Sequence, residues 1–127
     1  MAIRSVSTKI CPEKSTFQYQ CDFLDKAGVI LGAGDLTTLT LTLYNQDAAK
    51  TIINLVDAVN VKDTGRGAFD GTTKRFTLTL LPADAPMVDA TKPLERHIAL
   101  LKWTYNAGAE GGAHEIEIPV RNLYKVT

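Results

Sequence analysis

The chain is poor in the residue types on which most catalytic sites depend. Its only serines are Ser5, Ser7 and Ser15, and it has two histidines, His97 and His114. Nucleophilic catalysis needs a hydroxyl or thiol beside a base that a third group orients. Because all three serines lie in the N-terminal stretch, far in sequence from both histidines, the sequence predicts no such arrangement. We therefore expect the protein not to be an enzyme.

An excess of charge of either sign is also lacking. The 127 residues include 14 basic and 14 acidic side chains, so the formal net charge is zero. Nucleic-acid binding relies on a basic excess or stripe that contacts phosphates, so we expect no nucleic-acid partner. Apolar runs such as residues 27–33 are too short to cross a bilayer, and the N-terminus lacks the apolar core of a secretory signal. We expect a protein that is made in the cytoplasm, with no signal peptide and no membrane partner.

Two cysteines, Cys11 and Cys21, are too few for a disulfide framework. Cys21 follows Phe17 and Tyr19 at a spacing of two, so it shares their face if this segment is a strand. We expect it to be a buried free thiol that packs as a small hydrophobic residue. A bridge between the two cysteines across a hairpin is the alternative.

The sequence predicts no cofactor and no metal site. Glu95 and His97 share a face of a predicted strand, but a metal bound there would lack further ligands. We therefore expect both histidines to be hydrogen-bonded strand residues. Aspartates in predicted turns, Asp84 among them, are expected to make local hydrogen bonds. A calcium site in the Asp63–Asp70 loop is the alternative for that segment.

What the chain does contain is alternation. From Asp35 to Leu43 the sequence reads Asp-Leu-Thr-Thr-Leu-Thr-Leu-Thr-Leu, so that leucine and threonine alternate over its last five residues. A period of two is typical of a strand with one buried face. The same pattern returns at residues 76–80 and 115–118. The sequence therefore predicts an antiparallel sandwich or barrel.

Turn signals separate about seven segments of this kind. The predicted strands are residues 17–23, 29–31, 37–44, a short strand ending at Ile53, and residues 76–81, 95–105 and 114–120. Residues 95–105 carry apolar side chains on both faces, which indicates a central strand. The whole predicts an all-β fold, an immunoglobulin-like antiparallel β-sandwich of about seven strands with one or two short helical turns in loops.

Two segments are less regular. Residues 1–15 are predicted to be an N-terminal arm or an irregular first strand, preceding a domain of residues 16–127. Residues 48–61 place apolar side chains at helical spacing, yet Thr51–Ile53 is β-branched throughout. We predict a short strand through Ile53 and then a helical turn near residues 55–61. Residues 63–73 are predicted to be a loop, and residues 82–85, which begin with proline, one helical turn.

Three residues are candidates for binding. Trp103 and Tyr105 share one face of a predicted strand and could form a platform on which a sugar stacks, although a tryptophan in a central strand is more often part of the core. Pro119 cannot donate a ladder hydrogen bond, so its strand is predicted to lie at an edge or to carry a bulge there. Such an open edge could pair with a strand of a neighbouring molecule.

The ordered set of motifs from about residue 36 to 124 resembles a small immunoglobulin-like family of tailed-bacteriophage structural proteins. The motifs are Leu-Thr-Leu-Tyr-Asn (41–45), Ile-Ile-Asn (52–54), Phe-Thr-Leu-Thr-Leu-Leu-Pro-Ala-Asp (76–84) with Met-Val (87–88), Glu-Arg-His (95–97), Leu-Lys-Trp-Thr-Tyr (101–105), Gly-Gly-Ala-His-Glu-Ile (111–116) and Val-Arg-Asn-Leu (120–123). The family comprises domains on baseplate, neck and capsid-decoration proteins, and it has no catalytic residues to transfer.

The resemblance implies a non-enzymatic virion protein that binds to the capsid, neck or tail and stabilises it, as a homo-oligomer or as repeated copies on a symmetric assembly. Among these, capsid decoration or head–tail connection is favoured, because the chain ends near Thr127 without a long helical or fibre region. Many identical contacts on a symmetric assembly give affinity without one strong site. The alternative is a carbohydrate or host-surface binding module of a phage tail, which would use Trp103 and Tyr105.

Overall fold

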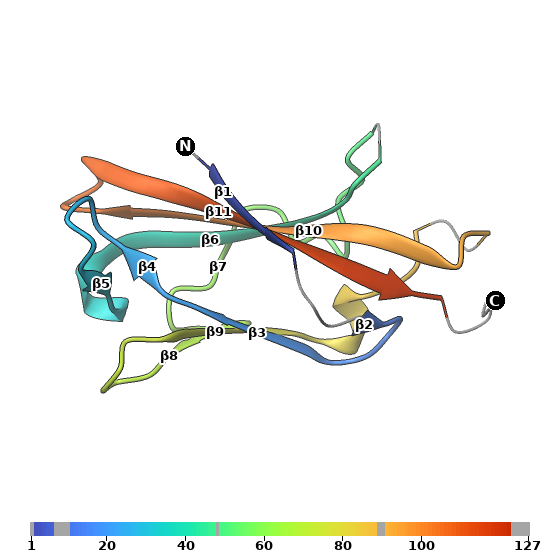
Figure 1. The fold of residues 1–127 in the computed structure, drawn as a ribbon, viewed down its shortest axis with the longest axis horizontal. Helices are drawn as coiled ribbons and strands as arrows, with labels where there is room; N and C mark the ends of the chain where they lie inside the picture. Colours follow the sequence, from blue (N-terminus) through green and yellow to red (C-terminus); the bar gives the residue numbers. More distant parts are fainter. Residues whose placement is uncertain (1, 7–10, 48, 89–90, 123–127) are drawn as a thin grey trace.

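The chain folds into strands packed as two main layers. The computed structural model describes residues 2–6, 11–47, 49–88 and 91–122. Its strands form sheets of six, three and two members. In Figure 1 the six-stranded sheet lies above the three-stranded sheet, and the core fills the space between them. The prediction of an all-β fold is therefore confirmed.

Within the described ranges, seven strands have three or more residues. They are β1 (Ala2–Val6), β3 (Phe17–Cys21), β6 (Leu36–Asn45), β8 (Gly67–Phe69), β9 (Phe76–Leu80), β10 (Leu94–Tyr105) and β11 (Glu110–Arg121). Four strands have two residues, namely β2 (Cys11–Pro12), β4 (Phe23–Leu24), β5 (Ile30–Leu31) and β7 (Val59–Asn60). Two short 3-10 turns, η1 (Ala33–Asp35) and η2 (Pro82–Asp84), complete the described elements. The predicted helical turn after Leu81 is thus confirmed.

The six-stranded sheet is built around β10. Its order is β1-β11-β10-β6-β7, with β2 beside β11 as well, so β10 has long antiparallel partners on both sides. Ile98 and Leu101 point to opposite faces of this strand, and both are fully buried. This confirms the prediction of a central strand over residues 95–105.

The leucine–threonine alternation of β6 acts as predicted. Leu39, Leu41 and Leu43 point into the core and are at most 1% exposed, whereas the threonines between them lie on the outer face. In the three-stranded sheet, with the order β3-β9-β8, Phe76 and Leu78 of β9 are buried in the same way. Burial of one apolar face on each sheet is the main contribution to the stability of such a fold.

Aromatic side chains close one end of the core. The ring of Phe23, from β4, lies 4.8 Å from the ring of Trp103 and 5.1 Å from that of Phe76, measured between centroids. Phe69 contacts Phe23 and Phe76 from β8. Tilted aromatic pairs at these separations stabilise a core beyond their buried area. The cluster therefore joins β4, β8, β9 and β10, which come from different sheets.

Strand β11 is not at an edge, and the prediction for Pro119 is wrong. The strand runs between β10 and two short parallel strands, with β1 pairing along Ala113–Glu117 and β2 along Val120–Arg121. Its register with β10 continues past Pro119 without a bulge. Among the described residues, neither β1 nor β2 pairs with Pro119, so the loss of one backbone N–H is tolerated there. Residues 7–10 of the N-terminal segment lie outside the described residues.

The prediction for residues 48–61 is also wrong in part. Ile52 makes a single bridge to Tyr44, but the described residues after it contain no helical turn, and Val59 and Asn60 form β7 instead. The segment runs along the edge of β6 without forming a regular strand. There, Leu43 donates to the Val56 carbonyl and accepts a hydrogen bond from the Ile53 N–H. Backbone pairing to β6 has overridden the weak helical spacing.

A strand inside residues 63–73 was missed. The segment contains β8, whose Gly67 pairs with Leu78 of β9. A Cβ at Gly67 would collide with the Val61 carbonyl oxygen and would lie 2.7 Å from Cε1 of Phe76. The glycine is thus required by close approach of two chain segments, a role that sequence cannot distinguish from a turn.

We predict that Gly67→Ala lowers the free energy of unfolding by about 1–3 kcal/mol, because the added methyl group overpacks the core and displaces backbone. The matched control is Gly71→Ala in the following turn, where an added Cβ would meet nothing within 4 Å. Urea unfolding followed by Trp103 fluorescence measures both. Equal stability of the two variants would contradict the assignment.

Candidate functional site

The structure places Trp103 inside the core. Its side chain is 8% exposed and packs on Phe23, and a Cβ at Gly112 would lie 2.6 Å from its ring. Among the described residues, its buried Nε1 has no hydrogen-bond partner. A ring enclosed on these sides has no free face on which a sugar could stack.

Tyr105 and Pro119 do not join Trp103 in one site. The half-buried Tyr105 uses its hydroxyl to accept a hydrogen bond from the Lys26 N–H at 3.1 Å. Lys26 also pairs with Glu110 at 2.7 Å, so these contacts fasten the β4–β5 turn to the β10–β11 hairpin. Pro119 is buried opposite Arg96, at the other end of β10 from Trp103. The three candidate residues therefore serve separate structural contacts.

Both histidines lie in strands and contact other side chains, and the hydrogen bond predicted for them is found at His97. The His97 Nε2 lies 3.0 Å from Oε1 of Glu95, and both side chains are almost fully buried. The Val88 N–H donates to the same carboxylate oxygen at 2.8 Å. Burial lowers the pKa of His97 below its ordinary value, against the opposing effect of Glu95. His114 stacks edge-on to Tyr19, and burial lowers its pKa as well.

Neither cysteine forms a disulfide. Cys11 is 1% exposed, and Cys21 is partly buried on the inner side of β3 with Phe17 and Tyr19. Burial, with a smaller contribution from Asp22, raises the pKa of Cys21 to about 12, although Arg75 opposes the shift. A thiol with so high a pKa carries almost no thiolate at neutral pH and is a poor nucleophile.

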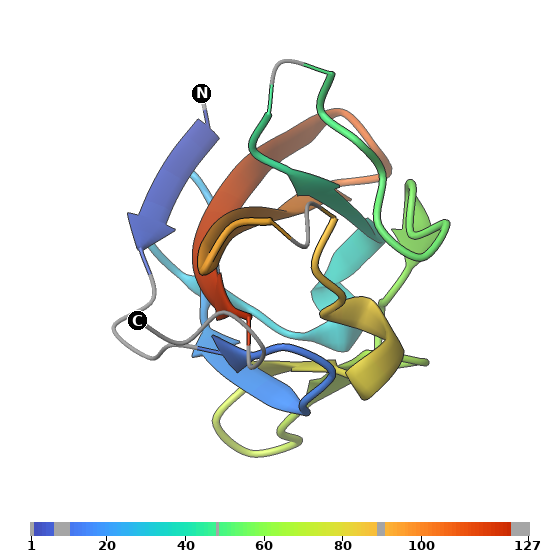
Figure 2. The ribbon, with the colours of Figure 1, turned by 90° about the vertical axis from the view of Figure 1, so that its right-hand side faces the viewer.

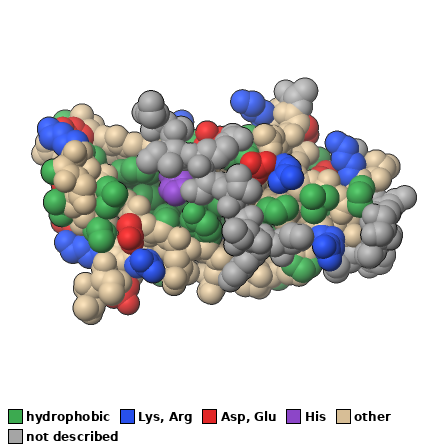
Figure 3. Space-filling view, in the orientation of Figure 1, with side chains coloured by type: hydrophobic (Ala, Val, Ile, Leu, Met, Phe, Trp, Pro, Cys, Tyr) green, Lys and Arg blue, Asp and Glu red, His purple; other side chains and the backbone are tan. Residues whose placement is uncertain are grey.

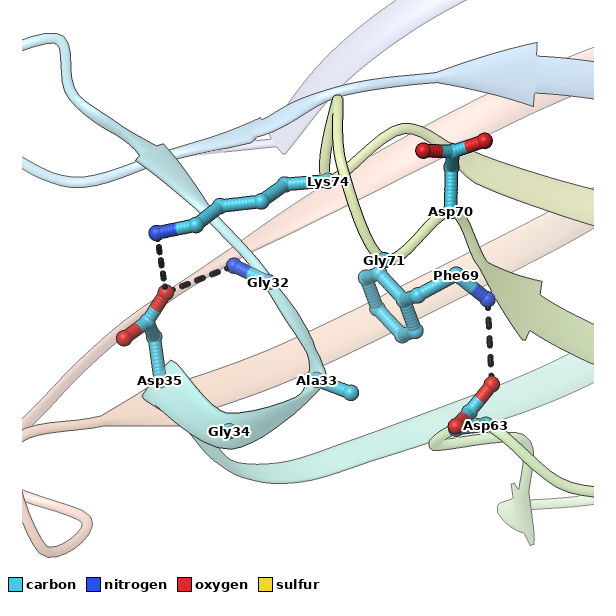
Figure 4. A pocket seen from close by; sticks show the side chains of 9 residues that line it. All are labelled: Gly32, Ala33, Gly34, Asp35, Asp63, Phe69, Asp70, Gly71 and Lys74. Atoms are coloured by element: carbon cyan, nitrogen blue, oxygen red, sulfur yellow. Dashed lines mark hydrogen bonds and ion pairs between the residues drawn. The ribbon is translucent and has the colours of Figure 1, made fainter.

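A hollow of about 300 Å³ opens between η1 and the turn after β8. Glycines and aspartates make up most of its lining, which comprises Gly32, Ala33, Gly34, Asp35, Asp63, Phe69, Asp70, Gly71 and Lys74. Figure 4 shows the Asp63 and Asp70 carboxylates on opposite sides of Phe69, while Lys74 reaches across to Asp35. Its three carboxylates do not converge on one point.

The aspartates of this hollow serve the backbone. Asp63 accepts a hydrogen bond from the Phe69 N–H, and Asp70 accepts from the N–H groups of Thr72 and Thr73. In the part of the chain that the structure describes, no group of three or more histidine, cysteine or acidic side chains could hold a metal ion. The calcium alternative therefore gains no support from the geometry.

One polar group that the sequence indicates only as a turn residue makes several buried hydrogen bonds. The Asp84 side chain is fully buried and binds the Arg66 guanidinium at two points, at 2.6 and 2.8 Å. Asn54 donates to it at 2.8 Å and the Leu81 N–H at 2.9 Å. The Leu81 bond is the local one expected, but the others reach 18 and 30 residues back along the chain. We call Asp84, Arg66 and Asn54 the Asp84 cluster.

The Asp84 cluster supports a leucine that points into solvent. The Val56 N–H donates to the Ile53 carbonyl, so Asn54 and Leu55 are the central residues of a tight turn, with φ values of 52° and 57°. Asparagine followed by glycine is the preferred pair for such a turn. Leu55 occupies the glycine position and is 92% exposed. The turn thus carries a large apolar side chain where both backbone and solvent disfavour one.

The charge state of Asp84 is set by its partners. Burial would raise its pKa, but the hydrogen bonds from Arg66, Asn54 and the Leu81 N–H together hold it below the ordinary value. The carboxylate therefore stays ionised and hydrogen-bonded at neutral pH, and the Asp84 cluster has a structural role.

Comparison of the chain with protein-family models, with curated proteins and with solved structures gives no match. No helix in the described ranges has the length and apolar character needed to cross a membrane.

We predict that Asp84→Asn lowers the free energy of unfolding at pH 7 by about 2–4 kcal/mol, since it leaves the Arg66 charge without its buried partner. Asp57→Asn, at an exposed position in the same region, is the control and should change stability by less than about 0.5 kcal/mol. Because the folded pKa lies below the unfolded value near 4, the stabilisation is complete above that pH and lost as the pH falls through the folded pKa. Guanidinium unfolding at pH 7 and pH 3 tests both statements, and an Asp84→Asn variant as stable as the control would refute them.

A second pH effect is expected from His97. Its folded pKa is below the unfolded value of about 6.5, so the unfolded chain binds the proton first and the protein loses stability as the pH falls below about 6.5. His97→Gln keeps an amide donor for Glu95 but does not titrate. The variant should lose less stability than the wild type between pH 7.5 and 5, as measured by urea midpoints. A loss equal to that of the wild type would show that His97 does not contribute.

Proposed function

We propose that this protein is a non-enzymatic structural component of a tailed-phage virion. It binds in multiple copies to the capsid, neck or tail and stabilises that assembly, and capsid decoration or head–tail connection is the favoured role. The proposal starts from the motif resemblance over residues 36–124. It is supported by the all-β architecture and by the way the chain uses its polar and apolar side chains.

Strand order supports the finer assignment to the immunoglobulin-like class. In that fold, strands G, F and C form one sheet, which the variable type extends with C′, and strands B, E and D lie in the other. Taking β11, β10, β6 and β7 as G, F, C and C′, and β3, β9 and β8 as B, E and D, gives the order found here. The tryptophan lies on β10, which corresponds to F, whereas antibody domains carry it on C.

Leu55 is the observation that carries the proposal. Its left-handed backbone costs about 1 kcal/mol relative to glycine, and its side chain gains no burial within the chain. Leu81, 50% exposed, flanks the same cluster, because its N–H binds Asp84. The Leu55 side chain, held in this exposed position by the turn, is available as a contact anchor for another protein.

The internal use of polar groups supports a role in adhesion over one in catalysis. Asp84 is held by Arg66, Glu95 by His97, and the aspartates of the hollow by backbone N–H groups. The bond between Asp84 and Arg66 joins segments 18 residues apart, and the other bonds fix local turns and strand ends. They are the arrangement expected of a stable scaffold, in which charged groups serve the fold.

We predict that Leu55→Gly abolishes attachment to the virion without weakening the fold. Asn54 followed by glycine suits the turn, so stability should stay equal or rise by up to about 1 kcal/mol. The matched control is Leu24→Asn, which removes a side chain 48% exposed on β4. Tagged protein is added to particles from a phage that lacks the gene, and bound copies are counted by mass spectrometry against the major capsid protein.

The expected result is a fixed copy number for the wild type and Leu24→Asn, and at least a tenfold loss of binding for Leu55→Gly. Wild-type binding by Leu55→Gly would remove this anchor from the account. Failure of the wild-type protein to bind any particle would contradict the virion role itself.

A further inference from the structure

The edges of the two main sheets differ in how they are protected. An uncovered strand edge pairs readily with another chain unless it is short, charged, interrupted by proline or covered. The edge of β6 that faces away from β10 is covered. Residues 51–61, which include β7, form backbone hydrogen bonds along it. On the far side of the six-stranded sheet, β2 is two residues long and includes Pro12. These edges carry recognised protections.

The three-stranded sheet is protected at one edge only. Its strand β8 has three residues and is flanked by Arg66 and Asp70. At the opposite edge, β3 has the sequence Phe-Gln-Tyr-Gln-Cys, with five residues and neither charge, proline nor glycine. Among the described residues, only β9 pairs with β3, so its outer edge has no neighbouring strand.

The position beside β3 is one that the fold class normally fills. In the immunoglobulin-like arrangement, strand A lies next to strand B in this sheet. Here the N-terminal strands β1 and β2 instead pair with β11 in the other sheet. Figure 2 shows β1 and β3 on the same side of the molecule but in different layers. As far as the structure describes the chain, the edge of β3 therefore remains unpaired and has room for one further strand.

The side chains near this edge indicate apolar contact as well as backbone pairing. Tyr19 and Cys21 point inward from β3 but remain partly exposed, and Tyr19 contacts His114 of β11 across the opening between the sheets. Figure 3 shows hydrophobic side chains and a histidine in the space between β11 and β3. A strand added at β3 would bury the partly exposed side chains of Tyr19 and Cys21 further.

The sequence of β3 is self-complementary. An antiparallel pair of β3 strands centred on Tyr19 places Gln18 of each copy opposite Gln20 of the other, on the outer face of the sheet. An amide both donates and accepts, so each such pair can be satisfied without charge. No like charges oppose each other within the five residues, and a two-fold axis uses the same surface on both copies.

We propose that the outer edge of β3 is a homodimer interface, in which the β3 strands of two copies pair antiparallel about a two-fold axis and join their three-stranded sheets into one of six strands. This interface is separate from Leu55. It can form in the isolated protein, whether or not the protein also attaches to a virion.

The test uses opposite charges at two exposed positions. Gln18→Lys/Gln20→Lys places lysines opposite lysines in the dimer, and Gln18→Glu/Gln20→Glu places glutamates opposite glutamates. Each variant should be monomeric by light scattering and sedimentation at concentrations where the wild type is a dimer. Mixing the two variants should restore a dimer, because each lysine then faces a glutamate.

Ala68→Lys, which adds the same charge at the β8 edge of the same sheet, is the control and should leave the dimer intact. Rescue by mixing distinguishes loss of the interface from misfolding, since an unfolded variant gains nothing from its partner. A monomeric wild type at high concentration, or dimers that persist in both double variants, would overturn the proposal. Disruption by Ala68→Lys alone would move the interface to the other edge.

Discussion

The pairing of β6 with β10 is the constraint on which the rest of the structure depends. The two strands pair from Asn45 and His97 to Leu36 and Tyr105, and each presents a buried apolar face to the core. The register of this pairing determines which face of the sheet packs on the core and which face is exposed to solvent. It positions β11 on one side and the irregular segment 51–61 on the other. Through Asp84, this segment is hydrogen-bonded to η2, and Asp84 also forms a buried ion pair with Arg66. These polar contacts add to the stability that apolar burial provides.

This organisation separates two uses of side chains. Charged and polar groups that could have formed a reactive site instead bind backbone or one another, and the bond between Asp84 and Arg66 connects segments 18 residues apart. Apolar groups are not all enclosed, because Leu55 projects from a turn that favours glycine. This arrangement supports the proposed role as a structural protein. Its proposed virion role and its proposed β3 interface both follow from surfaces that the internal contacts keep rigid.

Much of the architecture could be predicted from the sequence because one-sided burial leaves a period of two. The alternation in β6 and β9, the two apolar faces of β10 and the proline-led turn at Pro82 all depend on local pattern. Pro119 and Gly67 could not be assigned in this way, since their roles depend on strands that are remote in sequence or on a close approach of two segments. The Asp84 cluster was missed for the same reason. A local signal predicts the bond to Leu81, but nothing in the sequence links Asp84 with Arg66.

The central claim is that the chain acts through an exposed apolar contact on a rigid scaffold. Hydrogen–deuterium exchange, compared between the free protein and the protein bound to its virion, tests this most directly. The account predicts that amides of residues 52–57 and 79–81 gain protection on binding, while those around the hollow at residues 32–35 and 69–74 exchange as before. Protection confined to the hollow, with residues 52–57 unchanged, would contradict it.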